Sequence, residues 1–245
     1  MNCYAVIPAR YASSRFPGKP LAMLAGKPIL QHVWERVQQS KLFDEVFIAT
    51  DDMKISAVAQ DFGAIVMLTD SDLPSGTDRV AAVAEFLEPD SVILNVQGDE
   101  PLISAKALSA LLQVFEDEEV LIASLMTGFS SEDDIHNPNM VKVVLDASGN
   151  ALYFSRSPIP YNRDRIKSLK YLRHIGVYGF RYAALMRFVS LPPGKLEGLE
   201  QLEQLRALEH GIPIRMVYSD YQGIGIDTPE DLERVSKTIQ EGTMK

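Results

Sequence analysis

Short apolar runs recur along the first half of the chain, and most of them are followed by a polar loop and an amphipathic segment. These runs predict five strands, at residues 3–7, 46–50, 64–68, 92–96 and 120–125. Near-continuous apolar strands are typical of a parallel sheet that is covered on both faces. The sequence therefore predicts an α/β fold, with a mostly parallel twisted sheet and helices on both faces.

The pattern changes in the middle of the chain. Residues 140–146 alternate between apolar and polar side chains, and the turn that follows allows residues 151–156 to return as an antiparallel strand. Residues 157–170 have little periodicity and predict a loop. We therefore expect a single domain over 1–245, with an antiparallel sub-domain at about 128–180.

The last third of the chain predicts further elements. Five leucines at three-residue spacing predict one amphipathic helix over 196–208. The apolar run 223–226 predicts a final strand. Thr228 then stands at an N-cap position, with Pro229 first in the helix and Asp231 third, which predicts a C-terminal helix.

Composition narrows the class of function. The chain has 245 residues, a net charge of −9 and a pI of about 5.0. Because nucleic acids are bound through a basic surface, we expect no nucleic-acid partner. No apolar run approaches the ~20 residues of a membrane span, and the chain begins directly with a predicted strand, so we expect no membrane association. The single cysteine, Cys3, excludes an intrachain disulfide and favours the cytoplasm.

The loop after the first strand carries three cations, Arg10, Arg15 and Lys19. Open α/β sheets bind ligands at the carboxyl ends of their strands, where this loop would lie. Backbone N–H groups and fixed cations at such an edge suit a polyphosphate. A solvated basic loop is the alternative, but Pro17 and Gly18 stiffen the segment and argue against it.

Two acidic residues follow apolar runs that would end at the same edge of the sheet. Asp99 comes after the run at 92–96, and Asp227 after the run at 223–226. Each alone could be a turn or capping residue. Together with the basic loop, the two carboxylates predict Mg²⁺ held between the protein and nucleotide phosphates.

The antiparallel part offers a second group of polar residues, Arg156, His174 and Tyr178. Strand alternation places His174 and Tyr178 on one face, which could hold a polar substrate, although His174 could also be structural. The sequence has no Gly-x-Gly-x-x-Gly motif after the first strand, no Gly-x-Ser-x-Gly elbow and no Walker pattern. A dinucleotide cofactor and a hydrolase triad are therefore not expected.

Motifs in a fixed order cover nearly the whole chain. They begin with IPARYASSRFPGKPL at 7–21 and continue at 48–51, 75–79, 95–102, 137–143, 152–156, 173–178, 202–206 and 226–231. This set resembles the bacterial cytidylyltransferases that activate acidic sugars. The resemblance implies a nucleotide-diphospho-sugar transferase-like fold.

The resemblance also implies a reaction. CMP would pass from CTP to the anomeric hydroxyl of 3-deoxy-D-manno-octulosonate (Kdo), an acidic eight-carbon sugar, giving CMP-Kdo and pyrophosphate for lipopolysaccharide biosynthesis. Positioning and charge neutralisation dominate such in-line transfers. Mg²⁺ is the implied cofactor, and a homodimer formed through the antiparallel part is the implied assembly.

The same resemblance assigns the site residues. It implies catalytic roles for Arg10, Arg15 and Lys19, which would neutralise the triphosphate, and for Asp99 and Asp227, which would hold Mg²⁺. The implied CTP-binding residues are Pro8, Ala9, Arg10, Arg15, Lys19, Ser75, Gly76, Thr77, Arg79 and Gln97. The implied sugar-binding residues are Arg79, Gln97, Arg156, His174, Tyr178, Glu203 and Gln204. Arginine suits a sugar carboxylate, and the other polar side chains suit hydroxyls.

Two other functions stay open. The same site could activate 8-amino-Kdo or a sialic-acid-like sugar, because the sequence does not separate these substrates. A catalytically inactive nucleotide-sugar-binding protein is the second alternative. Such a protein would be expected to lack at least one of Lys19, Asp99 and Asp227, yet all three are present.

Overall fold

The computed structural model of the chain describes residues 1–12, 16–166, 168–223, 225–226 and 228–240. The chain divides into two compact units. Unit 1 comprises Met1–Leu108 and Gly223–Lys245, and unit 2 comprises Ser109–Gln222. The antiparallel sub-domain expected at 128–180 falls within unit 2.

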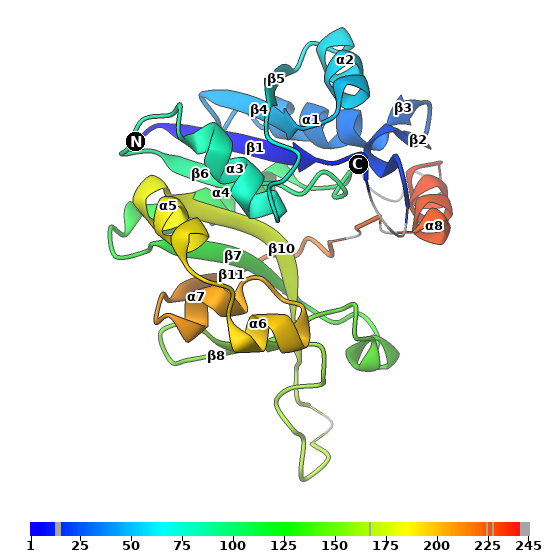
Figure 1. Cartoon of the computed structure of the whole chain (residues 1–245). Helices are drawn as coiled ribbons and strands as arrows, with labels where there is room; N and C mark the ends of the chain where they lie inside the picture. Colours follow the sequence, from blue (N-terminus) through cyan, green and yellow to red (C-terminus); the bar gives the residue numbers. More distant parts are fainter. Residues whose placement is uncertain (13–15, 167, 224, 227, 241–245) are drawn as a thin grey trace. The chain divides into compact units, whose positions relative to one another are not determined.

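Unit 1 contains a parallel sheet in the order β6-β1-β4-β5 (Figure 1). The strands are β1 (Cys3–Ala9), β4 (Glu45–Thr50), β5 (Ile65–Leu68) and β6 (Val92–Asn95). Val6 pairs with Phe47 on one side and with Asn95 on the other. Strands β1 and β6 are almost wholly buried, as their continuous apolar runs predict.

Helices flank this sheet, so the predicted α/β architecture is confirmed. They are α1 (Ile29–Gln39), α2 (Met53–Asp61) and α3 (Gly76–Ala84). The short elements η1 (Lys19–Leu21), β2 (Met23–Leu24) and β3 (Lys27–Pro28) lie between β1 and α1. Helix α2 begins at Asp52, whose carboxylate accepts the N–H groups of Lys54 and Ile55. Trp34, the single tryptophan, packs on Phe62 with ring centroids 5.3 Å apart, and thereby joins α1 to the end of α2.

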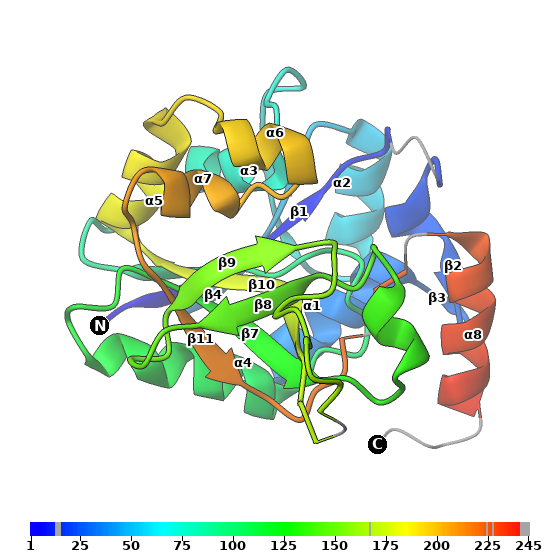
Figure 2. The ribbon, with the colours of Figure 1, turned by 90° about the horizontal axis from the view of Figure 1, so that it is seen from below.

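Unit 2 is built mainly from antiparallel strands (Figure 2). Its strands are β7 (Ile122–Gly128), β8 (Lys142–Leu145), β9 (Ala151–Ser155), β10 (Leu172–Arg181) and β11 (Ile214–Tyr218). Strand β10 is antiparallel to β7 and β8, β8 is antiparallel to β9, and only β11 runs parallel to its partner β7 among the described strands of this unit. The predicted return of 151–156 onto 140–146 is thereby confirmed.

The prediction of one continuous helix over 196–208 is wrong. Between β6 and β11 the helices are α4 (Ala105–Gln113), η2 (Val114–Glu116), η3 (Asp133–His136), α5 (Tyr182–Ser190), α6 (Lys195–Glu200) and α7 (Leu205–Glu209). Gln201 has a φ of 52°, a left-handed conformation that ends α6. The leucines at three-residue spacing therefore belong to two short helices with a turn between them.

The C-terminal part confirms one prediction and corrects another. Thr228 Oγ1 accepts the N–H of Asp231, and Asp231 Oδ2 accepts the N–H of Thr228, so the predicted cap begins α8 (Pro229–Gln240). The described residues of the run at 223–226 form no strand, and Gly223 has a φ of 54°. None of the helices in the described ranges combines the length and apolar character that a membrane crossing requires.

Candidate active site

The loop after β1 is closed on itself and tied to a second loop. Gly18 adopts a left-handed φ of 72°, and its N–H donates to the Tyr11 carbonyl over 3.0 Å. Arg10 reaches across to the loop before α3, where its guanidinium donates to the carbonyls of Leu73 (2.8 Å) and Pro74 (3.3 Å). These contacts fix Arg10 at the carboxyl end of β1, as predicted. Arg15 lies outside the described residues.

The structure brings Lys19 and Asp99 together. Lys19 Nζ lies 2.7 Å from Asp99 Oδ2, and the two side chains are mostly buried. A Cβ atom on the neighbouring Gly98 would lie 3.0 Å from the Pro8 carbonyl oxygen, so a larger residue would require that carbonyl to move by a few tenths of an ångström. Lys19 stands in η1 after β1, and Asp99 follows β6. An ammonium next to a carboxylate suits the phosphate and metal chemistry that the sequence predicts, and both roles stay predictions.

The donor set at Asp99 fits Mg²⁺. The Ile226 N–H donates to the Asp99 carbonyl over 3.0 Å, so the segment next to Asp227 lies against Asp99, while Asp227 itself is outside the described residues. Within the described ranges, no three His, Cys, Asp or Glu side chains gather into a metal-binding group. A Mg²⁺ ion that shares substrate phosphates needs only one or two protein carboxylates, so the Asp99 carboxylate suits such an ion, and the ion itself stays a prediction.

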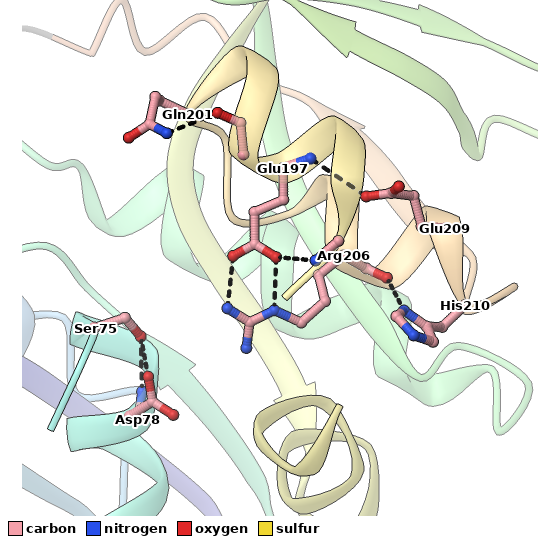
Figure 3. A network of polar contacts seen from close by, with 9 residues as sticks. Ser75, Asp78, Glu197, Gln201, Arg206, Glu209 and His210 are labelled. Carbon is pink, nitrogen blue, oxygen red and sulfur yellow. Dashed lines mark hydrogen bonds and ion pairs between the residues drawn. The ribbon is translucent and has the colours of Figure 1, made fainter. Parts of the chain in front are cut away.

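The first turn of α3 lies beside β1 and β6. Ser75 Oγ accepts the Asp78 N–H and donates to the Asp78 carboxylate, and these contacts cap α3 (Figure 3). A Cβ atom on Gly76 would lie 3.5 Å from the Pro8 ring and 3.9 Å from Gln97 Oε1. The predicted CTP-binding residues Pro8, Gly76 and Gln97 are therefore neighbours in unit 1.

A hydrogen-bonded row of polar side chains runs behind this turn. Gln97 Nε2 donates to Asn95 Oδ1 (3.0 Å), and Asn95 Nδ2 donates to Thr77 Oγ1 (3.3 Å). Asn95 is fully buried. The sequence-based assignment missed it, although a polar residue that ends an otherwise apolar strand was a visible sign of such a role.

Arg79 is the predicted site residue whose surroundings differ most from expectation. Its side chain is fully buried, with Nη2 at 3.3 Å from Asp51 Oδ2 and Nη1 bonded to Thr69 Oγ1. Burial lowers the pKa of the guanidinium, and the Asp51 carboxylate opposes that shift. The structure thus favours a supporting role for Arg79, which ties α3 to Asp51 and Thr69. Its contact with CTP or sugar stays a prediction.

In unit 2, carbonyl groups surround the guanidinium of Arg156. Its Nε, Nη1 and Nη2 donate to the carbonyls of Glu200 (2.7 Å), Pro138 (2.9 Å) and Gln201 (3.1 Å). The Glu200 carboxylate in turn accepts the Arg156 N–H and the Ser155 hydroxyl. Arg156 therefore joins the end of β9 to the end of α6. Nothing in the sequence distinguishes Glu200 from the other glutamates of that segment, so its role was not predicted.

His174 and Tyr178 share a face of β10, as predicted. Their ring centroids lie 5.4 Å apart, and the His174 ring also stands edge-on to Phe154 at 4.9 Å. His174 Nε2 lies 2.9 Å from Ser124 Oγ. Burial, with the charge of Arg173 as a second cause, lowers the pKa of His174 to about 3, so the ring is neutral at physiological pH.

Glu203 and Gln204 occupy the turn between α6 and α7. Burial and then the Glu203 carboxylate raise the pKa of Tyr178 well above its ordinary value, so Glu203 lies near the aromatic face of β10. Gln204 is buried, and its Nε2 has no hydrogen-bond partner among the described residues. Two groups result: the predicted nucleotide and metal residues lie in unit 1, and Arg156, His174, Tyr178, Glu203 and Gln204 lie in unit 2.

The chain is similar to known cytidylyltransferases over most of its length. A family model described as "Cytidylyltransferase" matches residues 4–216. The 3-deoxy-manno-octulosonate cytidylyltransferase of Thermodesulfovibrio yellowstonii is 48% identical, over 98% of each chain. Its namesake from Syntrophobacter fumaroxidans is also 48% identical, over 96% of each chain.

Solved structures give the same result for the fold. A structure of CMP:2-keto-3-deoxy-manno-octonic acid synthetase complexed with CTP is 42% identical, with a TM-score of 0.93 over 99% of this chain and 100% of that one. A cytidylyltransferase from Leptospira borgpetersenii is 17% identical, with a TM-score of 0.66 over 98% and 87% of the two chains, and shares the fold. The family match over most of the chain, the full-length relatives and the residues at the strand ends agree: the chain belongs to the cytidylyltransferase family.

Proposed function

We propose that the chain transfers CMP from CTP to the anomeric hydroxyl of Kdo, giving CMP-Kdo and pyrophosphate for lipopolysaccharide biosynthesis. The observation that carries this proposal is full-length similarity to relatives named 3-deoxy-manno-octulosonate cytidylyltransferase. The motifs that hold Lys19, Asp99 and the α3 turn are intact, which supports an active enzyme over an inactive binder.

The nucleotide is bound through unit 1 in this proposal. Gly76 and Thr77 at the start of α3, with Pro8 and Ala9, approach the cytosine, and Gln97 lies beside them. Arg10, Arg15 and Lys19 neutralise the triphosphate and the departing pyrophosphate. The carbonyl contacts of Arg10 hold its charge in place before substrate arrives, so little reorganisation is needed.

Mg²⁺ is the proposed cofactor, with Asp99 and Asp227 as its protein ligands. When bound, Mg²⁺ would polarise the α-phosphate and acidify the attacking hydroxyl. Before substrate binds, Lys19 neutralises Asp99 across 2.7 Å. Lys19 can therefore turn its ammonium to a phosphate oxygen when the Asp99 carboxylate takes another partner.

The sugar is bound through unit 2 in this proposal. Gln204 offers a buried amide donor, Tyr178 stays protonated and can donate through its hydroxyl, and the neutral His174 can accept or donate. Neutral groups of this kind suit sugar hydroxyls. No covalent intermediate is required, because the sugar hydroxyl itself attacks the α-phosphorus.

A steady-state assay with CTP, Mg²⁺ and a panel of acidic sugars tests the function. We expect pyrophosphate release with Kdo, with CMP-Kdo identified as the product by mass spectrometry. Release with 8-amino-Kdo or a sialic-acid-like sugar, and none with Kdo, would replace the proposed substrate. No release with any sugar, alongside CTP binding, would favour the inactive binding protein.

We also propose a cytoplasmic homodimer formed through unit 2. A cavity of about 680 Å³ is lined there by residues of the 132–136 and 158–171 segments, and Tyr161 and Ile166 at its rim are exposed. Exposed apolar side chains around a hollow are typical of a protein interface. CTP as substrate and the single cysteine support the proposed cytoplasmic location. Light scattering should give a mass near two chains, and a one-chain mass at working concentration would refute the dimer.

A further inference from the structure

We propose that Arg206 is a positioning residue, which holds the turn at 201–204 in the conformation that presents Glu203 and Gln204 to the sugar. This inference rests on the proposed function and deepens it. Arg206 acts through Glu197 on the preceding helix.

The contact between Arg206 and Glu197 is bidentate (Figure 3). Arg206 Nε donates to Glu197 Oε2 over 2.9 Å, and Nη2 donates to Oε1 over 2.6 Å. The side chains are 10% and 14% exposed, and the guanidinium lies over the Phe188 ring at 5.0 Å. A planar fork on a carboxylate fixes both distance and orientation, and partial burial strengthens the attraction.

A second contact from α7 fixes the start of α6. The Glu209 carboxylate accepts the N–H groups of Leu196 (3.0 Å) and Glu197 (3.2 Å), the free donors of the first turn. A Cβ atom on Gly194 would lie 1.9 Å from Glu209 Oε2, so the side chain occupies the space that glycine leaves. Two α7 residues therefore hold α6.

The other end of α6 is held by Arg156. Its Nε and Nη2 donate to the carbonyls of Glu200 and Gln201, which are acceptors that the end of a helix leaves open. Gln201 follows in the left-handed conformation, with a φ of 52°. The turn at 201–204 thus follows a fixed helix and precedes α7, in which Arg206 is the second residue.

The fixed turn holds the side-chain amide of Gln204 in one position. Its buried Nε2 has no hydrogen-bond partner within the described part of the chain, and such a group is unfavourable unless a ligand completes it. Sites of this kind bind well when the supporting contacts lock the donor before the ligand arrives. The α6–α7 contacts supply that support from outside the site.

Arg206→Lys tests this role, because lysine keeps the charge and loses the fork. We expect the KM for Kdo to rise roughly ten-fold while the KM for CTP stays within about two-fold, as a small displacement of a binding group predicts. Glu197→Gln should give the same pattern. Arg215→Lys serves as the matched control, since Arg215 forms a longer and more exposed contact with Asp117 in the same unit.

Hydrogen exchange separates this inference from the proposed function. In Arg206→Lys, the amides of 201–205 should exchange faster, whereas those of β10 should keep their wild-type rates. Unchanged exchange in the turn, or a lower melting temperature with unchanged KM values, would overturn the positioning role. If Arg206→Lys does not fold, Glu197→Gln decides by the same two readouts. If the wild-type protein uses no sugar, the proposed function is wrong. Hydrogen exchange would still test whether Arg206 holds the turn at 201–204.

Discussion

At the scale of single residues, the ion pair of Lys19 and Asp99 is the feature that chemistry depends on most. Each member is mostly buried and the charges lie 2.7 Å apart, so removing one leaves the other poorly compensated. This explains why two residues 80 positions apart in sequence belong to one site. Because Asp99 is both a member of this ion pair and a proposed metal ligand, its substitution is the most direct test of the metal proposal.

Asp99→Asn should lower kcat by about 100-fold or more, because a neutral amide replaces a carboxylate ligand of the proposed metal. CTP binding measured without metal should survive, since Lys19 then keeps its charge for the phosphates. Titration calorimetry with CTP, with and without Mg²⁺, together with initial rates, checks both parts.

Asp90→Asn is the matched control for this substitution, because Asp90 is exposed in a turn of the same unit. It should leave both the rate and CTP binding unchanged. A near-normal rate for Asp99→Asn would show that the metal assignment is wrong.

At the scale of elements, the approach of β1 to the segment after β6 depends on Gly98. Gly98→Ala would place a methyl group 3.0 Å from the Pro8 carbonyl, which must then move by a few tenths of an ångström. We expect a loss of about 1–3 kcal/mol of stability, as for other overpacked sites, and a higher KM for CTP. Urea denaturation and initial rates measure the two effects.

Gly198→Ala provides the comparison, because Gly198 lies on α6 and a Cβ atom there meets nothing within 4 Å. That variant should be neutral or slightly more stable, since alanine favours the helix. Equal behaviour of the two variants would contradict the role given to Gly98.

Some of the helices and strands could be predicted from the sequence, and others could not. Apolar runs predicted the strands of unit 1, and local cap chemistry predicted the helix that starts after Thr228, because both depend on neighbours in sequence. The break at Gln201 was missed, since it is stabilised by Arg156, a residue 45 positions away. The run at 223–226 has strand-like composition, yet Gly223 takes a positive φ and the Ile226 N–H bonds Asp99 outside any ladder.

The residues of the candidate site also fall into a predicted group and a group that was not predicted. The shared edge of the strand ends predicted that Lys19 lies near Asp99, and strand alternation predicted that His174 lies near Tyr178. The structure confirms both neighbourhoods. The burial of Arg79 against Asp51 was not predicted, because composition does not reveal which arginine enters a core. Asn95 and Glu197 were not predicted, because their contacts are with other polar side chains, and no chemical pattern in the sequence marks such contacts.

At the scale of the whole molecule, His174 should make stability depend on pH. Its pKa is about 3 in the folded chain and near 6.5 when unfolded, so between these values the unfolded state binds the extra proton. Stability contributed by the neutral ring is therefore complete above pH 6.5. It falls by about 1.4 kcal/mol for each pH unit below that value.

His174→Gln should flatten this dependence. Urea denaturation at several pH values between 5 and 7, on wild type and variant, measures the two slopes. The wild-type curve should be steeper by the equivalent of about one proton. Parallel curves would mean that His174 titrates alike in both states, and the burial of its ring could not then be the cause of a pH effect.

The packing of Trp34 on Phe62 gives the chain a built-in optical reporter. Because the chain has one tryptophan and it lies in unit 1, its emission follows the melting of that unit alone, whereas circular dichroism sums both units. Coincident transitions by the two methods would mark one cooperative unfolding event, and separate transitions would resolve two. Measured at several pH values, Trp34 emission and circular dichroism would show whether protonation of His174 destabilises unit 2 alone or the entire chain.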